Sequence, residues 1–315
     1  MEMNDDIKDL VSKLTEKYDN TGQDVKAYLE GLLESDFVPY WNYINLDTLL
    51  TLQKPKTKYP DELIFIIYHQ ISELYFRLML NECEQITDKQ DISAEEMLMR
   101  LVRINRYFSI ITDSFDVMQV GMEQEQFLKF RMALLPASGF QSAAYRKIEF
   151  YSTSLKNIVG KDFRQNFNEE SSINDMYPFL YWKAGATEIG TGIKTFTLRQ
   201  FEEHYDDEFI ALAEKLKGKT IQDIFNARFK ENESIIKMLK KLDQNVNVNF
   251  PLQHYKTAVK YLQRNPDDIP ATGGTNWQKY LPPRFQKRIF YADLWTEQEI
   301  EEWGKAWVEE ARKNF

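Results

Sequence analysis

The sequence predicts an all-α protein built as a bundle of long helices, and three observations support this fold class. Apolar residues recur at helical spacing over long stretches such as 60–86 and 93–119. No alternating strand pattern extends beyond a few residues, and the best candidate, VNVNF at 246–250, is short. Few Pro- or Gly-rich linkers interrupt the 315 residues, so we expect a single helical domain over 1–315.

The stretch 60–86 is the most apolar part of the chain. It is hydrophobic on nearly every side, which predicts a helix that is buried all round. Pro60 suits the first turn of this helix. Phe65, His69 and Glu73 follow i, i+4 spacing and therefore share one face. A buried histidine needs a partner, so His69 is either a satisfied core residue or a functional one.

The other elements follow from apolar spacing and from breaks at glycine and proline. The residues between 160 and 196 are predicted to be irregular. We expect Ser138 to cap a helix that resumes near Phe140 after a break at 136–139. The predicted helices are 4–19, 22–35, a short one after Asn45, 93–119, 126–155 with that break, 197–217, 220–229, a pattern from 232 to 264 that is two helices or one helix kinked near Pro251, and 295–314.

Composition excludes several classes of function. The net charge of −9 argues against a nucleic-acid surface, which requires a basic face. No charge-free apolar run reaches the ~18 residues of a membrane span, so we expect no membrane partner. The acidic N-terminus lacks the apolar core of a signal peptide, which favours the cytoplasm. Cys83 is the only cysteine, so no intrachain disulfide or thiolate cluster can form, and we expect it to be buried as a small apolar residue.

Histidine and arginine supply the candidate functional groups. The chain has three histidines, His69, His204 and His254, which excludes a histidine-rich metal site by number alone. His204 lies in the acidic run FEEHYDDEF and is expected at the surface. By spacing alone, His254 is best interpreted as a structural helix histidine. Arg131 is flanked by apolar residues, and it is either a surface or ion-pair residue or a clamp for a carboxylate.

Three blocks together resemble the tryptophan 2,3-dioxygenase family, over roughly residues 40–295. The first is DELIFIIYHQISELYF around His69, and the second is FRMALLPASGFQSAAYRKIEF, where PASGFQS follows Arg131. The third is His254 followed by TGGTNWQKYL. The Gly-rich part of this block lacks the strand and the Lys-Ser/Thr of a phosphate-binding loop, and we expect it to be a mobile loop over the substrate.

The resemblance implies an all-helical homotetramer, a dimer of dimers, that uses haem b with ferrous iron. It implies that the chain opens the indole ring of L-tryptophan with O2 to give N-formylkynurenine, in the kynurenine pathway of tryptophan catabolism. His254 would be the axial ligand of the haem iron, and His69 would be the distal histidine beside the indole N–H. Ser138 and Gly139 would border the haem.

The resemblance also implies a set of substrate contacts. Phe65 would pack on the indole, Arg131 would hold the carboxylate with Phe127 one turn before it, and Thr272 would meet the ammonium group and a haem propionate. The N-terminal segment 1–50 would pack on a neighbouring subunit. Three of its residues would reach that subunit's pocket, namely Tyr40, Tyr43 and Ile44.

The third block departs from the family pattern. FPLQ (250–253) replaces a basic lead before His254, and Trp277 stands where the family prefers small residues. Two other hypotheses therefore stand beside the dioxygenase. One is a related haem-dependent aromatic oxygenase that acts on another indole or a modified tryptophan. The other is a haem-binding helical protein without catalysis.

Overall fold

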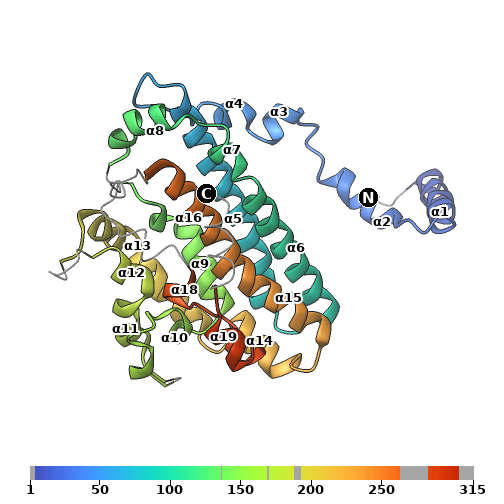
Figure 1. Ribbon diagram of the computed structural model, residues 1–315. Coiled ribbons are helices and arrows are strands. Elements are labelled where there is room, and N and C mark those ends of the chain that lie inside the picture. Colours follow the sequence, from blue (N-terminus) through green and yellow to red (C-terminus); the bar gives the residue numbers. More distant parts are fainter. Residues whose placement is uncertain (1–3, 136, 169, 188–192, 263–282, 305–315) are drawn as a thin grey trace. The chain divides into compact units, whose positions relative to one another are not determined.

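The computed structural model describes residues 4–135, 137–168, 170–187, 193–262 and 283–304 (Figure 1). Helices dominate these ranges, where strand-like pairing is limited to two isolated bridges, Val159 with Leu180 and Thr187 with Lys194. The predicted all-α class is therefore confirmed. The chain divides into two compact units, Met1–Lys54 and Pro55–Phe315.

The first unit contains the predicted N-terminal helices. They are α1 (Asp5–Asp19), α2 (Val25–Leu33), α3 (Tyr40–Tyr43) and α4 (Leu46–Leu49). The side chains of Asn4 and Asp24 accept backbone N–H groups at the starts of α1 and α2, which fixes where these helices begin. Asn45 enters α4 with a positive φ of 52°, a conformation that asparagine tolerates better than most residues.

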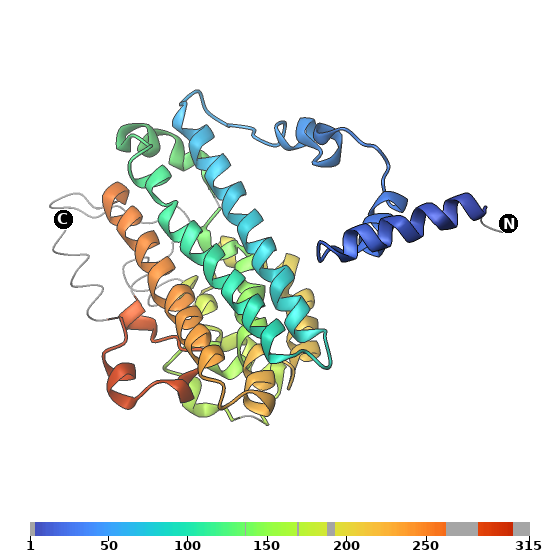
Figure 2. The ribbon, with the colours of Figure 1, turned by 90° about the vertical axis from the view of Figure 1, so that its right-hand side faces the viewer.

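In the second unit, long helices pack side by side around a large apolar core, and two smaller apolar clusters lie beside it. Helix α5 (Asp61–Thr87) contacts α6 (Ala94–Asp113) and α9 (Ala143–Ser152), while α15 (Glu233–Gln244) packs on the other side of α6 (Figure 2). A capping box between Ser93 and Glu96 starts α6. Cys83 is fully buried in this core, as predicted.

Burial of α5 on every side was the wrong expectation. One side is buried through Tyr68, Phe76 and Met79, because it packs against α6 and α9. The other side carries a stripe of apolar residues that are between 38% and 55% exposed, namely Leu63, Ile67, Ile71, Leu74 and Leu78. A helix that is apolar on all sides is expected to be shielded from water, but the pattern does not show whether its own chain or another molecule shields each side.

Helix α5 is also long and apolar enough to be compared with a membrane-spanning helix. Within the described residues, α5 is the one helix whose length and composition would allow it to cross a bilayer, with a mean hydropathy of 1.3 in its most apolar window. Core helices of soluble proteins pass the same test. In this structure α5 packs against α6 and α9 on one side and leaves its apolar stripe exposed on the other.

Shorter elements connect the long ones, and the irregular 160–196 of the prediction contains several. Ser142 caps α9, whereas the predicted cap Ser138 begins a 3-10 turn. The predicted helix 295–314 is described up to residue 304. The elements are α7 (Asp116–Gln119), α8 (Gln124–Phe130), η1 (Arg131–Leu134), η2 (Gly139–Gln141), α10 (Leu155–Ile158), η3 (Arg164–Asn166), α11 (Ile173–Met176), η4 (Tyr177–Phe179), α12 (Tyr181–Gly185), α13 (Phe196–Leu216), α14 (Ile221–Arg228), α18 (Pro283–Gln286), η6 (Ala292–Leu294) and α19 (Glu297–Glu301).

The break predicted near Pro251 is a π-turn. Helix α15 continues through η5 (Asn245–Asn249), which has π geometry, into α16 (Phe250–Leu262). The strand-like sequence VNVNF falls largely within this turn. The pattern 232–264 is therefore one interrupted helix over its described part, which ends at residue 262, and the interruption lies just before His254.

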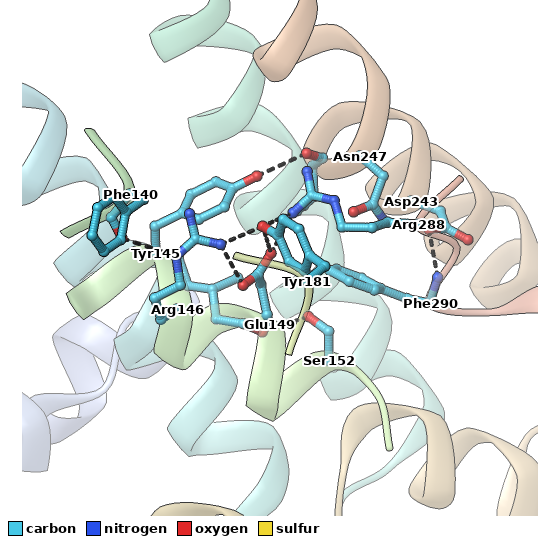
Figure 3. A network of polar contacts seen from close by, with 12 residues as sticks. Phe140, Tyr145, Arg146, Glu149, Ser152, Tyr181, Asp243, Asn247, Arg288 and Phe290 are labelled. Carbon is cyan, nitrogen blue, oxygen red and sulfur yellow. Dashed lines mark hydrogen bonds and ion pairs between the residues drawn. The ribbon is translucent and has the colours of Figure 1, made fainter. Parts of the chain in front are cut away.

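A buried network of charged and polar groups joins α9 to the C-terminal part of the second unit (Figure 3). Glu149 accepts hydrogen bonds from Arg146 at 2.8 Å, Tyr181 at 2.7 Å and Arg288 at 2.5 Å. The two guanidinium groups also contact the Tyr181 hydroxyl. A buried carboxylate is tolerated when it is paired and hydrogen-bonded in this way.

Candidate active site

His69 lies in the N-terminal half of α5, and its partner is its own helix. The Nδ1 atom is 2.7 Å from the carbonyl oxygen of Phe65, one turn earlier. Since a carbonyl only accepts, Nδ1 carries the proton and donates, which leaves Nε2 with its lone pair. The ring reaches solvent, but the surrounding protein removes much of its hydration and lowers its pKa. His69 is therefore a neutral acceptor near pH 7.

Aromatic rings form one wall beside His69. The Phe65 ring lies 4.1 Å from the His69 ring, centroid to centroid, and 6.2 Å from that of Phe127. Phe130 packs edge-on against both phenylalanines, at 5.8 Å and 5.5 Å. The structure therefore brings together two predicted substrate contacts, Phe65 of α5 and Phe127 of α8. A flat apolar ligand ring would find stacking partners here.

Arg131 follows α8 at the first position of η1. Its side chain is almost buried, with 6% exposed, and burial lowers the pKa of the guanidinium. An arginine stays charged at any physiological pH, so burial makes an anionic partner valuable. The carbonyl of Phe127, one turn earlier, accepts the backbone N–H of Arg131, so the two residues are consecutive turns of one helical segment.

His254 lies on α16 and faces Gly139 of η2. A Cβ placed on Gly139 would lie 3.2 Å from His254 Cε1 and 3.8 Å from Nε2, so only glycine fits beside this ring without displacement. The Phe115 ring lies 6.3 Å from the His254 ring. Within the described ranges, no residue hydrogen-bonds to either ring nitrogen of His254.

The two histidines are close enough to affect each other. Loss of hydration and the charge that His69 would carry lower the pKa of His254 to about 4. The His254 imidazole is therefore neutral near pH 7, with a lone pair available. This is the state that an axial ligand of haem iron requires. One neutral imidazole beside a glycine, with a second histidine near enough to affect its pKa, fits a haem that takes one protein ligand.

The surroundings of this pair agree with that fit. Ser138 precedes Gly139 and donates its backbone N–H to the Gln141 side chain at 2.9 Å, which closes the 3-10 turn that carries Gly139. Among the described residues, no group of three or more His, Cys, Asp or Glu side chains could hold a bare metal ion. His204 is exposed on α13, as predicted, and takes no part in the site.

Four predicted site residues remain: three belong to the first unit, and Thr272 is the fourth. Thr272 lies outside the described residues, as does the rest of the Gly-rich loop. Tyr40 and Tyr43 are strongly exposed in the first unit, and Ile44 is half-buried there. Their predicted contact with a neighbouring subunit stays a prediction.

Sequence reasoning missed two features of the site. The Tyr68 ring lies 6.0 Å from the His69 ring and 5.7 Å from the ring of Phe115, the residue that borders His254. Its position one residue before His69 carries no recognisable signal. The π-turn before His254 was signalled by Pro251 within a helical pattern, but the signal did not distinguish a kink from a π-turn.

Comparison with known proteins places the chain. A family model described as tryptophan 2,3-dioxygenase matches residues 30–179. The chain is 39% identical over 269 residues to a tryptophan 2,3-dioxygenase of Ruegeria sp., an alignment that covers 83% of this chain and 92% of the relative. A tryptophan 2,3-dioxygenase of Bacillus thuringiensis subsp. konkukian is 28% identical over 285 residues, covering 86% and 96%. One from Herpetosiphon aurantiacus is 26% identical over 269 residues, covering 83% and 98%. With near-complete alignment to such relatives and the paired histidines of the site, the chain belongs to the tryptophan 2,3-dioxygenase family.

Proposed function

We propose that this protein opens the indole ring of L-tryptophan with O2 to give N-formylkynurenine, using haem held by His254. The observation that carries the proposal is the pair of neutral imidazoles. His254 has free ring nitrogens among the described residues and sits beside Gly139, while His69 presents an acceptor nitrogen. The family is haem-dependent, and bound haem supplies the iron that makes O2 reactive toward the indole.

The substrate offers three groups, and the described residues match two of them. The indole ring fits against Phe65 and Phe127, whose rings line one wall. The carboxylate suits the guanidinium of Arg131, which burial makes a strong partner for an anion. We assign the ammonium group to Thr272, as the family resemblance implies. Together these contacts would orient the ring and exclude water from it.

His69 orients the substrate in this proposal. Its Nδ1–H is engaged by the Phe65 carbonyl, so Nε2 accepts a hydrogen bond from the indole N–H. The lowered pKa keeps the ring neutral and able to accept. Insertion of both atoms of O2 requires no outside electrons, so the chain needs no docking site for an electron-transfer partner.

We further propose that the protein works as a homotetramer in the cytoplasm. The apolar stripe on α5 would be covered by another copy, since a surface of five large aliphatic residues favours a partner over water. The exposed aromatic residues of the first unit, among them Tyr40 and Tyr43, would contribute to a neighbouring subunit's pocket.

The test is a product assay. Ferrous, haem-loaded protein is mixed anaerobically with L-tryptophan and then with O2, and formation of N-formylkynurenine is followed by its absorbance. We expect turnover by the wild type and none by His254→Ala, whose haem spectrum should also change. Absence of product from L-tryptophan, with turnover of a substituted indole, would instead identify an oxygenase for another substrate. Absence of haem uptake would exclude both enzymes.

A further inference from the structure

The helix that carries His254 contains an interruption that the proposed catalytic roles do not use. In η5 the backbone N–H of Phe250 donates to the carbonyl of Asn245, five residues earlier, instead of four. A π-turn of this kind adds one residue to the helix, and such turns recur at functional sites. Because each residue of an α-helix advances by about 100°, every side chain after the turn is rotated by about that angle.

The rotation decides which side chain faces the site. Before the turn, the buried face of the helix follows regular spacing through Ile235, Leu239, Leu242 and Val246. In an uninterrupted α-helix this face would continue through position 253, and residue 254 would lie about 100° away. Because the π-turn adds one residue, His254 takes the direction that position 253 would have in an uninterrupted helix. Gln253 is turned aside instead, where Gln119 donates to its side chain at 3.2 Å.

Pro251 leaves one carbonyl of the turn without its backbone partner. In the π pattern, the Val246 carbonyl would pair with the N–H of residue 251, and proline has none. The Tyr145 hydroxyl of α9 donates to this carbonyl oxygen at 2.9 Å (Figure 3). Burial raises the pKa of Tyr145, so the hydroxyl keeps its proton and remains a donor. A buried carbonyl without a partner is costly, and Tyr145 removes that cost.

Side chains around the turn hold it from other directions. Asn245 donates to Asn105 of α6 at 3.0 Å and accepts from Asn249 at 3.0 Å. The Tyr145 ring stacks on Phe250, with centroids 5.4 Å apart. Phe250 in turn lies 5.4 Å from Phe115, the ring that borders His254. The turn and the site are therefore joined by continuous packing.

We propose that Tyr145 is a positioning residue for the haem ligand: its hydroxyl replaces the N–H that Pro251 lacks, locks the π-turn and thereby aims His254 at the site. The inference rests on the proposed function, because it takes His254 as the ligand. It adds a second structural requirement, which is that the ligand's direction depends on a side chain of a different helix.

The experiment combines three variants, Tyr145→Phe, Pro251→Ala and the double variant. In ferrous haem-loaded protein, resonance Raman spectroscopy measures the iron–histidine stretch, and transfer to a haem acceptor measures haem loss. We expect Tyr145→Phe to shift the stretch and to speed haem loss roughly tenfold, the scale set by one unpaired buried carbonyl. Pro251→Ala restores an N–H, so the double variant should return toward the wild type in both measurements.

Tyr151→Phe is the matched control, because it removes another buried tyrosine hydroxyl from α9. It should leave both measurements unchanged. If Tyr145→Phe lowers thermal stability but leaves the stretch and haem loss at wild-type values, Tyr145 is only structural and the inference is wrong. Failure of the double variant to improve on Tyr145→Phe would also overturn it. A wild type without an iron–histidine band would remove the proposed function as well.

Discussion

Arg131 shows how a single residue can define the substrate. Its guanidinium is nearly buried, and a nearby carboxylate would gain from a charge-assisted, two-pronged hydrogen bond. Such a pair contributes on the order of 2–4 kcal/mol when buried. Loss of this charge should therefore weaken the binding of substrates that carry a carboxylate and leave the binding of other ligands unchanged.

Replacement of Arg131 with Leu is therefore expected to weaken L-tryptophan binding by a factor of roughly 30 or more. The KM for L-tryptophan and the Kd from spectral titration measure the effect. Binding of indole, which has no carboxylate, is the control and should change little. The affinity of Arg131→Lys for L-tryptophan should fall between those of the wild type and Arg131→Leu, because lysine keeps the charge but not the planar fork. Equal losses for tryptophan and indole would contradict a carboxylate clamp.

Gly139 tests the close approach to His254. A methyl group here would lie 3.2 Å from His254 Cε1, so Gly139→Ala forces the imidazole or the turn to move. Overpacking of this kind costs about 1–3 kcal/mol. We expect faster haem loss and an altered haem absorption band, measured as for the wild type. Gly31→Ala is the control, since a Cβ there meets no atom within 4 Å. Unchanged haem binding in Gly139→Ala would show that the close approach of Gly139 to His254 is not needed to hold the haem.

At the scale of the elements, periodicity predicted the helices well where one face is buried. The predicted 197–217 and 220–229 agree with α13 and α14 to within a residue, because their apolar faces and capping residues mark the ends. The π-turn was beyond this reasoning. Apolar spacing up to Val246 is regular, and the extra residue is fixed by Pro251, Tyr145 and Asn105, two of which lie more than 100 residues away.

The candidate site was predictable to the extent that motifs carry it. Spacing alone placed Phe65 and His69 on one face but favoured a structural role for His254, and only the resemblance paired the two histidines. The partner of His69 could not be predicted, because a histidine in a helix can bond to its own backbone or to a distant group with the same sequence. In the structure, His69 bonds to the Phe65 carbonyl of its own helix.

Asp243 ties helix α15 to the loop residues on either side of η6 and makes stability depend on pH. It lies in α15 and accepts hydrogen bonds from the backbone N–H groups of Phe290 and Tyr291 and from Trp295. Burial nevertheless raises its pKa from 3.8 to about 6. The folded protein then binds this proton more tightly than the unfolded chain does. Between about pH 4 and pH 6 this residue therefore lowers stability as the pH rises.

We expect this contribution to reach about 3 kcal/mol, since one pKa unit corresponds to about 1.4 kcal/mol. Denaturant unfolding of the wild type and of Asp243→Asn across pH 4 to 7 measures it. The difference between the two proteins should change with pH in that window, with the wild type losing stability relative to the variant. A difference that is constant from pH 4 to 7 would mean that Asp243 keeps an ordinary pKa.

At the scale of the whole molecule, the main open feature is the apolar stripe on α5, which the packing among the described residues leaves exposed. Five large aliphatic side chains face water along four turns of the helix, while the opposite side of α5 is core. The sequence marked this helix as apolar on nearly every side, and the described residues of the second unit cover only one side of it. We assign the other half to contact between copies of the chain.

Leu74 is the most exposed member of the stripe, so Leu74→Asp is the sharpest test of that contact. Burying a leucine contributes about 1.5–3 kcal/mol, and an unpaired carboxylate in its place is strongly unfavourable. In an assembly with repeated interfaces the effect recurs at each copy, so we expect the variant to dissociate into smaller species. Light scattering coupled to size-exclusion chromatography measures the mass. Phe196→Asp is the control, because Phe196 is equally exposed but lies on α13. If Leu74→Asp keeps the wild-type mass, the stripe does not form the interface, and another surface must hold the subunits together.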